Sequence, residues 1–373
     1  MLLLDTMYGK KVPRAPSVPK IWIDLAANLL GRDYLDLFDN PLYAAQTVVE
    51  AAITCNCDGV RVFLFSKRDV HKEDNAFIHR HESRRLGQVD IEGGWATIFE
   101  NPGDIDFSDP STLICYQFYK SKKPIIKNAK DIEKISVPSL HTFHELYGEY
   151  VDKVLELAED KICPIGDCSS GTLAFCVSMM GMEETLINLY SEPKAIETLI
   201  ERGIELSITQ AKFMLDKGIR VLRYNDSVAN MNVISPEMWR TFIKPKLTEF
   251  CSRIHAYCSD SRIYCHICGN IKPVVHDLVE TGLDCIAPLD PLGKFSVGEI
   301  RHLVGDDFML MGGVDTLSFI NKNPETVRLE AERCIREGFI NHKNFAIGSG
   351  CVVPRTAKIE TLQALAEASK NVM

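Results

Sequence analysis

Eight short apolar segments, separated by stretches of helical periodicity, are the feature that most constrains how this chain can fold. Alternating strand and helix signals indicate parallel strands joined by right-handed crossovers. Eight such units predict a (β/α)8 TIM barrel, a fold of the α/β class. The predicted strands cover residues 20–25, 59–65, 162–167, 220–226, 262–268, 283–290, 308–315 and 345–351.

A doubly wound open sheet is the alternative fold, but no Gly-x-Gly-x-x-Gly motif follows the first predicted strand. We therefore expect residues 1–373 to form a single barrel domain, with residues 1–19 as an N-terminal arm. Residues 66–135 interrupt the alternation with charged and turn-rich segments, including one at 113–119. This region predicts a β-hairpin or lid inserted after the second strand.

The composition excludes several classes of protein. Apolar residues at 46% and charged residues at 25% are typical of a soluble globular protein. A formal net charge of −9 argues against non-specific nucleic-acid binding, and no apolar run is long enough to span a membrane. Thirteen scattered cysteines in a chain of this length indicate reduced thiols rather than a disulfide framework. We expect a cytoplasmic protein.

Two potential metal ligands stand at the end of the fifth predicted strand. His266 and Cys268 are two residues apart, so an extended strand would point both side chains to the same face. Cys265 would point to the opposite face and serve as packing, as we also expect of Cys285 and Cys334.

Cys351, at the end of the eighth predicted strand, is the leading third ligand. Barrel active sites lie at the carboxyl ends of the strands, which would bring Cys351 to the same ion as His266 and Cys268. Imidazole and sulfur ligands favour zinc, and three protein ligands leave one position open for a substrate. The alternative, in which these cysteines are inert buried residues, stays open at this point.

Other polar residues also follow predicted strands. An aspartate in this position either caps the next helix or serves the active site, and the sequence does not separate the two. Lys67 and Arg68, after the second strand, are candidates for binding an anionic group, or are solvated loop residues. The aspartates concerned are Asp24, Asp167, Asp226, Asp290 and Asp315.

A zinc ion held by two thiolates is electron-rich and generates hydroxide poorly. Such an ion is better suited to keeping a bound thiol deprotonated and nucleophilic. It can also polarise an ether oxygen as a leaving group. Both reactions belong to alkyl transfer.

The chain resembles the uroporphyrinogen decarboxylase superfamily from about residue 20 to residue 370. Its His-x-Cys motif with a distant cysteine is similar to the zinc signature of the corrinoid-dependent methyltransferase branch, which includes the methylcobamide:coenzyme M enzymes. The matching stretches are 124–127, 131–135, 224–227, 233–239, 266–270, 312–315 and 324–327.

The resemblance implies a zinc-dependent methyltransferase with His266, Cys268 and Cys351 as zinc ligands. A methyl group would move between a small thiol or methylated substrate and the cobalt of a corrinoid on a partner protein; a homodimer is left open. Asp167 and Asp226 would orient the substrate or handle protons, with Asp24, Asp290 and Asp315 as weaker candidates.

Two alternatives remain. One is a metal-free decarboxylase of the same superfamily, although residues 20–25 lack the arginines that true decarboxylases carry near the first strand. The other is a barrel with structural zinc that acts as a binding scaffold.

Overall fold

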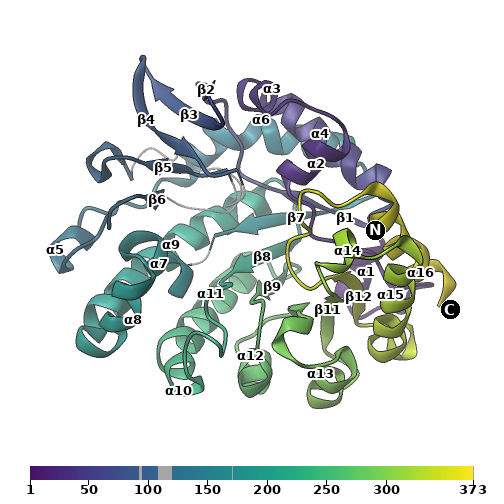
Figure 1. Cartoon of the computed structure of the whole chain (residues 1–373). Coiled ribbons are helices and arrows are strands. Elements are labelled where there is room, and N and C mark those ends of the chain that lie inside the picture. The colour runs from purple at the N-terminus through teal and green to yellow at the C-terminus, as the bar shows by residue number, and fades with distance from the viewer. Residues whose placement is uncertain (92–94, 108–119, 170, 373) are drawn as a thin grey trace.

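A curled, seven-stranded parallel sheet forms the centre of the protein (Figure 1). The computed structural model describes residues 1–91, 95–107, 120–169 and 171–372. The strand order follows the chain, β1-β7-β8-β9-β10-β11-β12, as in a barrel of repeated β-α units. These strands are β1 (Gly59–Val62), β7 (Cys163–Cys168), β8 (Val221–Asn225), β9 (Arg262–His266), β10 (Cys285–Leu289), β11 (Met309–Val314) and β12 (Phe345–Ser349).

An extended stretch at residues 16–20 runs beside β12 in the position of an eighth strand. Val18 N donates to Ile347 O at 2.8 Å on one side, and Asp58 N, just before β1, donates to Ser17 O at 2.8 Å on the other. Isolated parallel bridges at Ser17 and Lys20 complete the pairing with the β12 side. The sheet is thereby closed into a barrel-like shape.

The prediction of a first strand at residues 20–25 is wrong. Residues from Ile23 onward form α2 (Ile23–Leu29), and Asp24 lies in the first turn of this helix rather than at a strand end. Pro16 and Pro19 lack the N–H that a continuous ladder needs, so only isolated bridges form before the helix begins.

The other seven predicted strands are confirmed, but several end earlier than expected. β9 ends at His266 and β12 ends at Ser349, so Cys268 and Cys351 lie in the loops that follow. The alternation argument therefore applies to His266 but not to the two cysteines.

A second, five-stranded sheet is inserted after β1 and lies to one side of the barrel (Figure 1). Its first four strands pair antiparallel in chain order, and the last pairing is parallel. The predicted segment at 113–119 lies outside the described residues. The strands are β2 (Val70–Glu73), β3 (Ala76–His81), β4 (Arg84–Val89), β5 (Thr97–Phe99) and β6 (Lys120–Ser121).

Helices surround the parallel sheet on its outer face (Figure 1). The longer ones are α4 (Pro41–Thr54), α6 (Leu140–Ala158), α9 (Pro193–Asp216), α11 (Lys244–Tyr257), α15 (Pro324–Gly338) and α16 (Ile359–Asn371). The others are α1 (Leu2–Met7), α3 (Tyr34–Asp39), α5 (Ala129–Ile132), α7 (Leu173–Met180), α8 (Met182–Ser191), α10 (Pro236–Met238), α12 (Val275–Glu280), α13 (Val297–Val304) and α14 (Ser318–Asn321). Short helical turns occur at Pro102–Asp104, Trp239–Ile243, Lys272–Val274, Pro291–Gly293 and Ile340–His342. Across the described ranges, none of these helices has the length and apolar character that a bilayer crossing requires.

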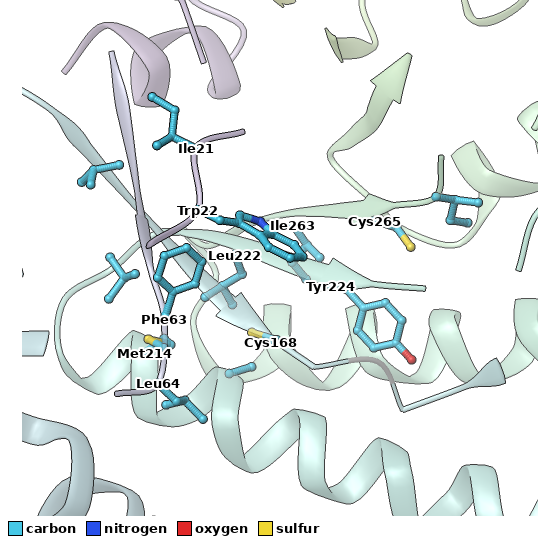
Figure 2. Close-up of a cluster of buried hydrophobic side chains, with 14 of the residues drawn as sticks. Ile21, Trp22, Phe63, Leu64, Cys168, Met214, Leu222, Tyr224, Ile263 and Cys265 are labelled. Atoms are coloured by element: carbon cyan, nitrogen blue, oxygen red, sulfur yellow. The ribbon is translucent and has the colours of Figure 1, made fainter. Parts of the chain in front are cut away.

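Apolar side chains pack in two separate layers. A large cluster fills the space between sheet and helices, and it includes Cys265 with Leu222 and Ile263 (Figure 2). A smaller cluster fills the barrel interior, where Leu3 of α1 packs with Tyr264 and other inward-facing strand residues. Cys265 thus points outward as predicted. The packing interpretation of Cys285 and Cys334 is confirmed as well, because both thiols are buried in these clusters.

Candidate metal centre

Three potential ligands meet at the carboxyl end of the barrel. His266 closes β9 and is buried, whereas Cys268 and Cys351 lie half-buried in the loops after β9 and β12. His266 Nε2 lies 3.8 Å from Cys351 Sγ, and one ligand atom from each residue lies within 4.8 Å of the other two. His266 and Cys351 are 85 positions apart in the sequence, and the fold brings their side chains together.

The spacing of these atoms suits a zinc ion. Zinc binds sulfur at ~2.3 Å and imidazole nitrogen at ~2.0 Å, which places tetrahedral ligand atoms roughly 3.5–3.8 Å apart. The 3.8 Å between His266 and Cys351 matches this separation. A donor set of one imidazole and two sulfurs disfavours magnesium and calcium, which prefer oxygen.

Asp290, after β10, is hydrogen-bonded to the Cys268 loop and lies close to the Cys351 loop. Its Oδ2 accepts from Gly269 N at 2.8 Å, and its Oδ1 accepts from Leu292 N at 3.0 Å. A Cβ on Gly350 would lie 3.2 Å from the same Oδ1 and 2.7 Å from Pro291 Cδ. Only a glycine lets the Cys351 loop approach the Asp290 turn this closely.

The two candidate cysteine ligands are hydrogen-bonded to each other. The Cys268 thiol donates a hydrogen bond to Cys351, which lowers the pKa of Cys351 to about 6, and the charge of Lys20 acts in the same direction. The same hydrogen bond, followed by burial, raises the pKa of Cys268. By contrast, burial alone raises the pKa of Cys55 to about 12. Of the two cysteines, Cys351 is therefore the one that forms a thiolate more readily.

Lys20 is a site residue that the sequence prediction missed. Its Nζ lies 3.0 Å from His266 Nε2 and 3.3 Å from Nδ1, and the side chain is buried over the Trp22 ring. Burial and the nearby Arg223 lower the pKa of Lys20 well below its usual value. The predicted strand began at Lys20, but nothing in the sequence indicated contact with a histidine 246 positions away.

Asp167, predicted as a catalytic candidate, lies fully buried in β7. Its Oδ1 accepts from Arg61 of β1 and from Arg223 Nη1 of β8, the latter at 3.0 Å. Arg223 also donates to Asn225, which pairs with His266 across the β8–β9 register. These contacts place Asp167 next to the layer of candidate ligands.

Asp226, the other catalytic candidate, caps α7. Its carboxylate accepts from Leu173 N at 3.2 Å, from Ala174 N at 2.8 Å and from the Thr172 hydroxyl. Its backbone N donates to His266 O at 3.0 Å. The side chain thus holds the start of α7, and the backbone is bonded to His266 at the end of β9.

The remaining predicted residues lie in different settings. Asp315 Oδ1 accepts from Leu317 N in the turn after β11, and Asp24 is buried in α2. Lys67 is exposed and pairs with Asp39 at 2.7 Å. Arg68 is buried and donates to Trp95 O at 2.8 Å, which ties the inserted sheet to the barrel. The structure brings together the three metal-ligand candidates with Asp290, whereas Lys67 and Arg68 serve contacts near the inserted sheet.

Comparisons with known proteins agree on the family. The family model described as uroporphyrinogen decarboxylase (URO-D) matches residues 117–372. A methylcobamide:CoM methyltransferase from Methanosarcina barkeri is 24% identical over 173 residues, 46% of this chain and 48% of the relative. A methylated-thiol–coenzyme M methyltransferase from Methanosarcina mazei is 23% identical over 213 residues, 57% of this chain and 54% of the relative.

The chain thus spans about half the length of the curated relatives it matches. Among solved structures, a methyltransferase from Methanosarcina mazei matches with a TM-score of 0.73 at 17% identity. This match covers 99% of this chain and 97% of the other, and at this identity it establishes the fold. Because the family model matches well over half of the sequence, this protein belongs to the uroporphyrinogen decarboxylase family.

Proposed function

We propose that this protein is a zinc-dependent methyltransferase. It moves a methyl group between a small thiol or methylated substrate and the cobalt of a corrinoid carried by a partner protein. The convergence of His266, Cys268 and Cys351 within 4.8 Å at the barrel mouth is the observation that carries the proposal. The names of the similar methyltransferases support the corrinoid part.

In this proposal His266, Cys268 and Cys351 hold the zinc ion, and the open fourth position takes the substrate heteroatom. When bound, zinc lowers the pKa of a thiol or withdraws electron density from an ether oxygen. A cysteine must be deprotonated to bind zinc. Because the pKa of Cys351 is already lowered to about 6, its thiol loses the proton readily.

The aspartates act through other groups. Asp290 holds the Cys268 loop through Gly269 N, and Asp226 N holds the His266 carbonyl. Asp167 fixes Arg223, which donates to Asn225 beside His266. We assign all three as positioning residues, because the contacts above end at backbone groups or at other side chains.

We further propose one functional domain, with the inserted β2–β6 sheet acting as a lid. Arg68 joins this sheet to the barrel by donating to Trp95 O and by stacking on the Phe38 ring at 4.9 Å.

Metal content and methyl transfer test the function together. Protein purified without chelator should contain about one zinc ion per chain. It should also transfer a methyl group between methylcobalamin and thiols, or from a methyl ether to reduced corrinoid. Cys351→Ser should lose zinc and activity together, whereas Cys285→Ser, a buried cysteine in the barrel interior, should keep both.

A metal-free decarboxylase is the second candidate, favoured by the family to which the chain belongs. It predicts no zinc and release of carbon dioxide from a porphyrinogen. Zinc that is retained in full by Cys351→Ser would contradict the methyltransferase proposal. A structural zinc site would be favoured by two results together. The protein would unfold when zinc is removed, and it would show no activity with any methyl donor or acceptor.

A further inference from the structure

Helix α8 presents large apolar side chains to solvent. Ile187 is 50% exposed and Tyr190 is 78% exposed, the highest value for a large apolar side chain in the described ranges. Glu183, Ile187 and Tyr190 are spaced by four and then three residues, so they lie on one face of the helix. Thr185 and Leu189, on the other side, are buried against the rest of the protein. Exposed apolar groups gathered on one helix are typical of a contact surface.

The same helix carries only acidic charge. Residues 181–192 contain three glutamates and no lysine or arginine. Glu183 and Glu184 are exposed in the first turn, and neither joins an ion pair in the described part of the chain. The helix dipole favours carboxylates at this position, but it does not account for the exposed Ile187 and Tyr190. The solvent face of α8 is therefore apolar with an acidic end.

A run of lysines carries the opposite charge. Residues 122–130, the lysine segment, lead from β6 into α5 and contain four lysines and no acidic residue. All four lysines are exposed, in a chain whose formal net charge is −9. Lys123, Lys127 and Lys130 form no ion pair with any described residue. The lysine segment is thus a positive surface that its own chain leaves largely unneutralised.

The lysine segment and α8 are neighbours. The N–H groups of Ile125 and Ile126 donate to Met179 O at 2.8 Å and 3.1 Å, and α8 begins only three residues later, at Met182. Figure 1 shows α5 and α8 at the same edge of the molecule, next to α7. The two surfaces therefore adjoin, yet no ion pair joins them within the described part of one chain. Adjoining surfaces of opposite charge meet the requirement of a two-fold interface, in which one patch must complement itself.

We propose that two copies of this chain associate about a two-fold axis, with α8 of each copy packed on the lysine segment of the other. The glutamates of the first turn then face lysines of the second copy. The aliphatic stems of these lysines cover Ile187, and an ammonium group lies over the Tyr190 ring. Because the two surfaces adjoin, both contacts form at once and the assembly closes as a dimer. This inference depends neither on the metal centre nor on the proposed function.

Sedimentation of the full chain tests the inference. We expect the wild type at micromolar concentration to sediment near twice the 41.9 kDa of one chain, and no larger. Tyr190→Asp should raise the dissociation constant about tenfold or more, because a charge replaces an aromatic contact. Leu329→Asp is the matched control, at a leucine that is 50% exposed on α15, and it should leave the dimer unchanged. Both side chains lie at the surface, so both variants should keep the wild-type Tm.

A charge exchange identifies the two surfaces that meet. The pair Glu183→Lys and Glu184→Lys should raise the dissociation constant about tenfold or more, because like charges then face each other. The pair Lys123→Glu and Lys127→Glu should do the same. All four substitutions together should restore the dissociation constant to within about threefold of the wild type, since opposite charges meet again. If Tyr190→Asp does not fold, this exchange still decides.

Three results would overturn the inference. A wild type that stays at 41.9 kDa at about 100 µM would leave this surface to a different partner. A dimer that both Tyr190→Asp and the charge reversals leave intact would have its interface elsewhere. A mass that grows beyond two copies would replace the closed two-fold contact with an open, head-to-tail one. Zinc content and methyl transfer are measured separately, so failure of the proposed function leaves this test unaffected.

Discussion

At the scale of single residues, Asp290 connects parts of the site that are far apart in the chain. One carboxylate oxygen fixes the loop that follows Cys268, and the other lies against the glycine that precedes Cys351. Burial raises the pKa of Asp290, against the hydrogen bonds from Leu292 and Gly269 that stabilise its charged form. These contacts place Asp290 between the loop of Cys268 and the loop of Cys351.

Replacing Asp290 should therefore weaken metal binding. In Asp290→Ala two backbone N–H groups lose a charged acceptor, which costs about 1.5–3 kcal/mol each. Zinc affinity, measured by competition with a chelator, should fall about 10- to 100-fold. Asp33→Ala, which removes a similar turn contact to Leu35 N at an exposed site, should leave zinc affinity unchanged. An unaltered zinc affinity in Asp290→Ala would remove Asp290 from the site.

Cys351 should be the most reactive thiol of the metal-free protein at neutral pH. Thiolates rather than thiols are alkylated, and the hydrogen bond from Cys268 lowers the pKa of Cys351 to about 6. The rate of one fast alkylation by iodoacetamide should rise as the pH increases through about 6 and level off above it. Cys351→Ser should abolish this fast phase and zinc should suppress it; a fast phase that survives Cys351→Ser would contradict the assignment.

At the scale of elements, Asp226, just after β8, has two roles that can be told apart. One is to cap α7, and the other is to position His266. The Asp226 carboxylate serves the first turn of α7, whereas its backbone N–H reaches the carbonyl of His266. A substitution changes the side chain and spares the backbone contact, so the two roles can be tested apart.

Asp226→Ala should lower stability and spare the metal. Loss of the contacts to Leu173 N and Ala174 N should reduce the free energy of unfolding by about 1–3 kcal/mol, measured in urea. Zinc stoichiometry should remain at the wild-type value, and Asp226→Asn should recover part of the stability. Lost methyl transfer at unchanged stability would instead make Asp226 a catalytic residue.

The same elements show what a sequence can predict here. Seven strands were predictable because β-branched runs alternate with helices, and His266 pointed inward by strand alternation. The first strand was not, because the apolar run at 21–25 continues into helix formers and proline interrupts the pairing before it. Cys351 was found by its position after a strand, whereas the contact of Lys20 with His266 depends on barrel closure, which local pattern does not encode.

At the scale of the whole molecule, the two ends of the barrel have different tasks. The carboxyl ends of the strands carry the candidate metal ligands, while α1 packs Leu3 and Met7 into the interior cluster formed with inward residues such as Cys163 and Val221. In barrels of this kind, residues at the carboxyl ends of the strands serve the active site, whereas the packed opposite end serves stability.

This division predicts that a cavity in the interior apolar cluster should lower the stability of the protein without changing the candidate metal site. Leu3 is fully buried, so Leu3→Ala should reduce the free energy of unfolding by about 2–5 kcal/mol. Zinc affinity should stay within about twofold of wild type, because Leu3 packs in the interior apolar cluster, which contains none of the three candidate ligands. Leu292→Ala, at a leucine 64% exposed beside the mouth, should barely change stability. If Leu3→Ala loses zinc under conditions where it remains folded, the floor and the mouth are coupled through the strands, and the metal centre depends on packing along the whole barrel.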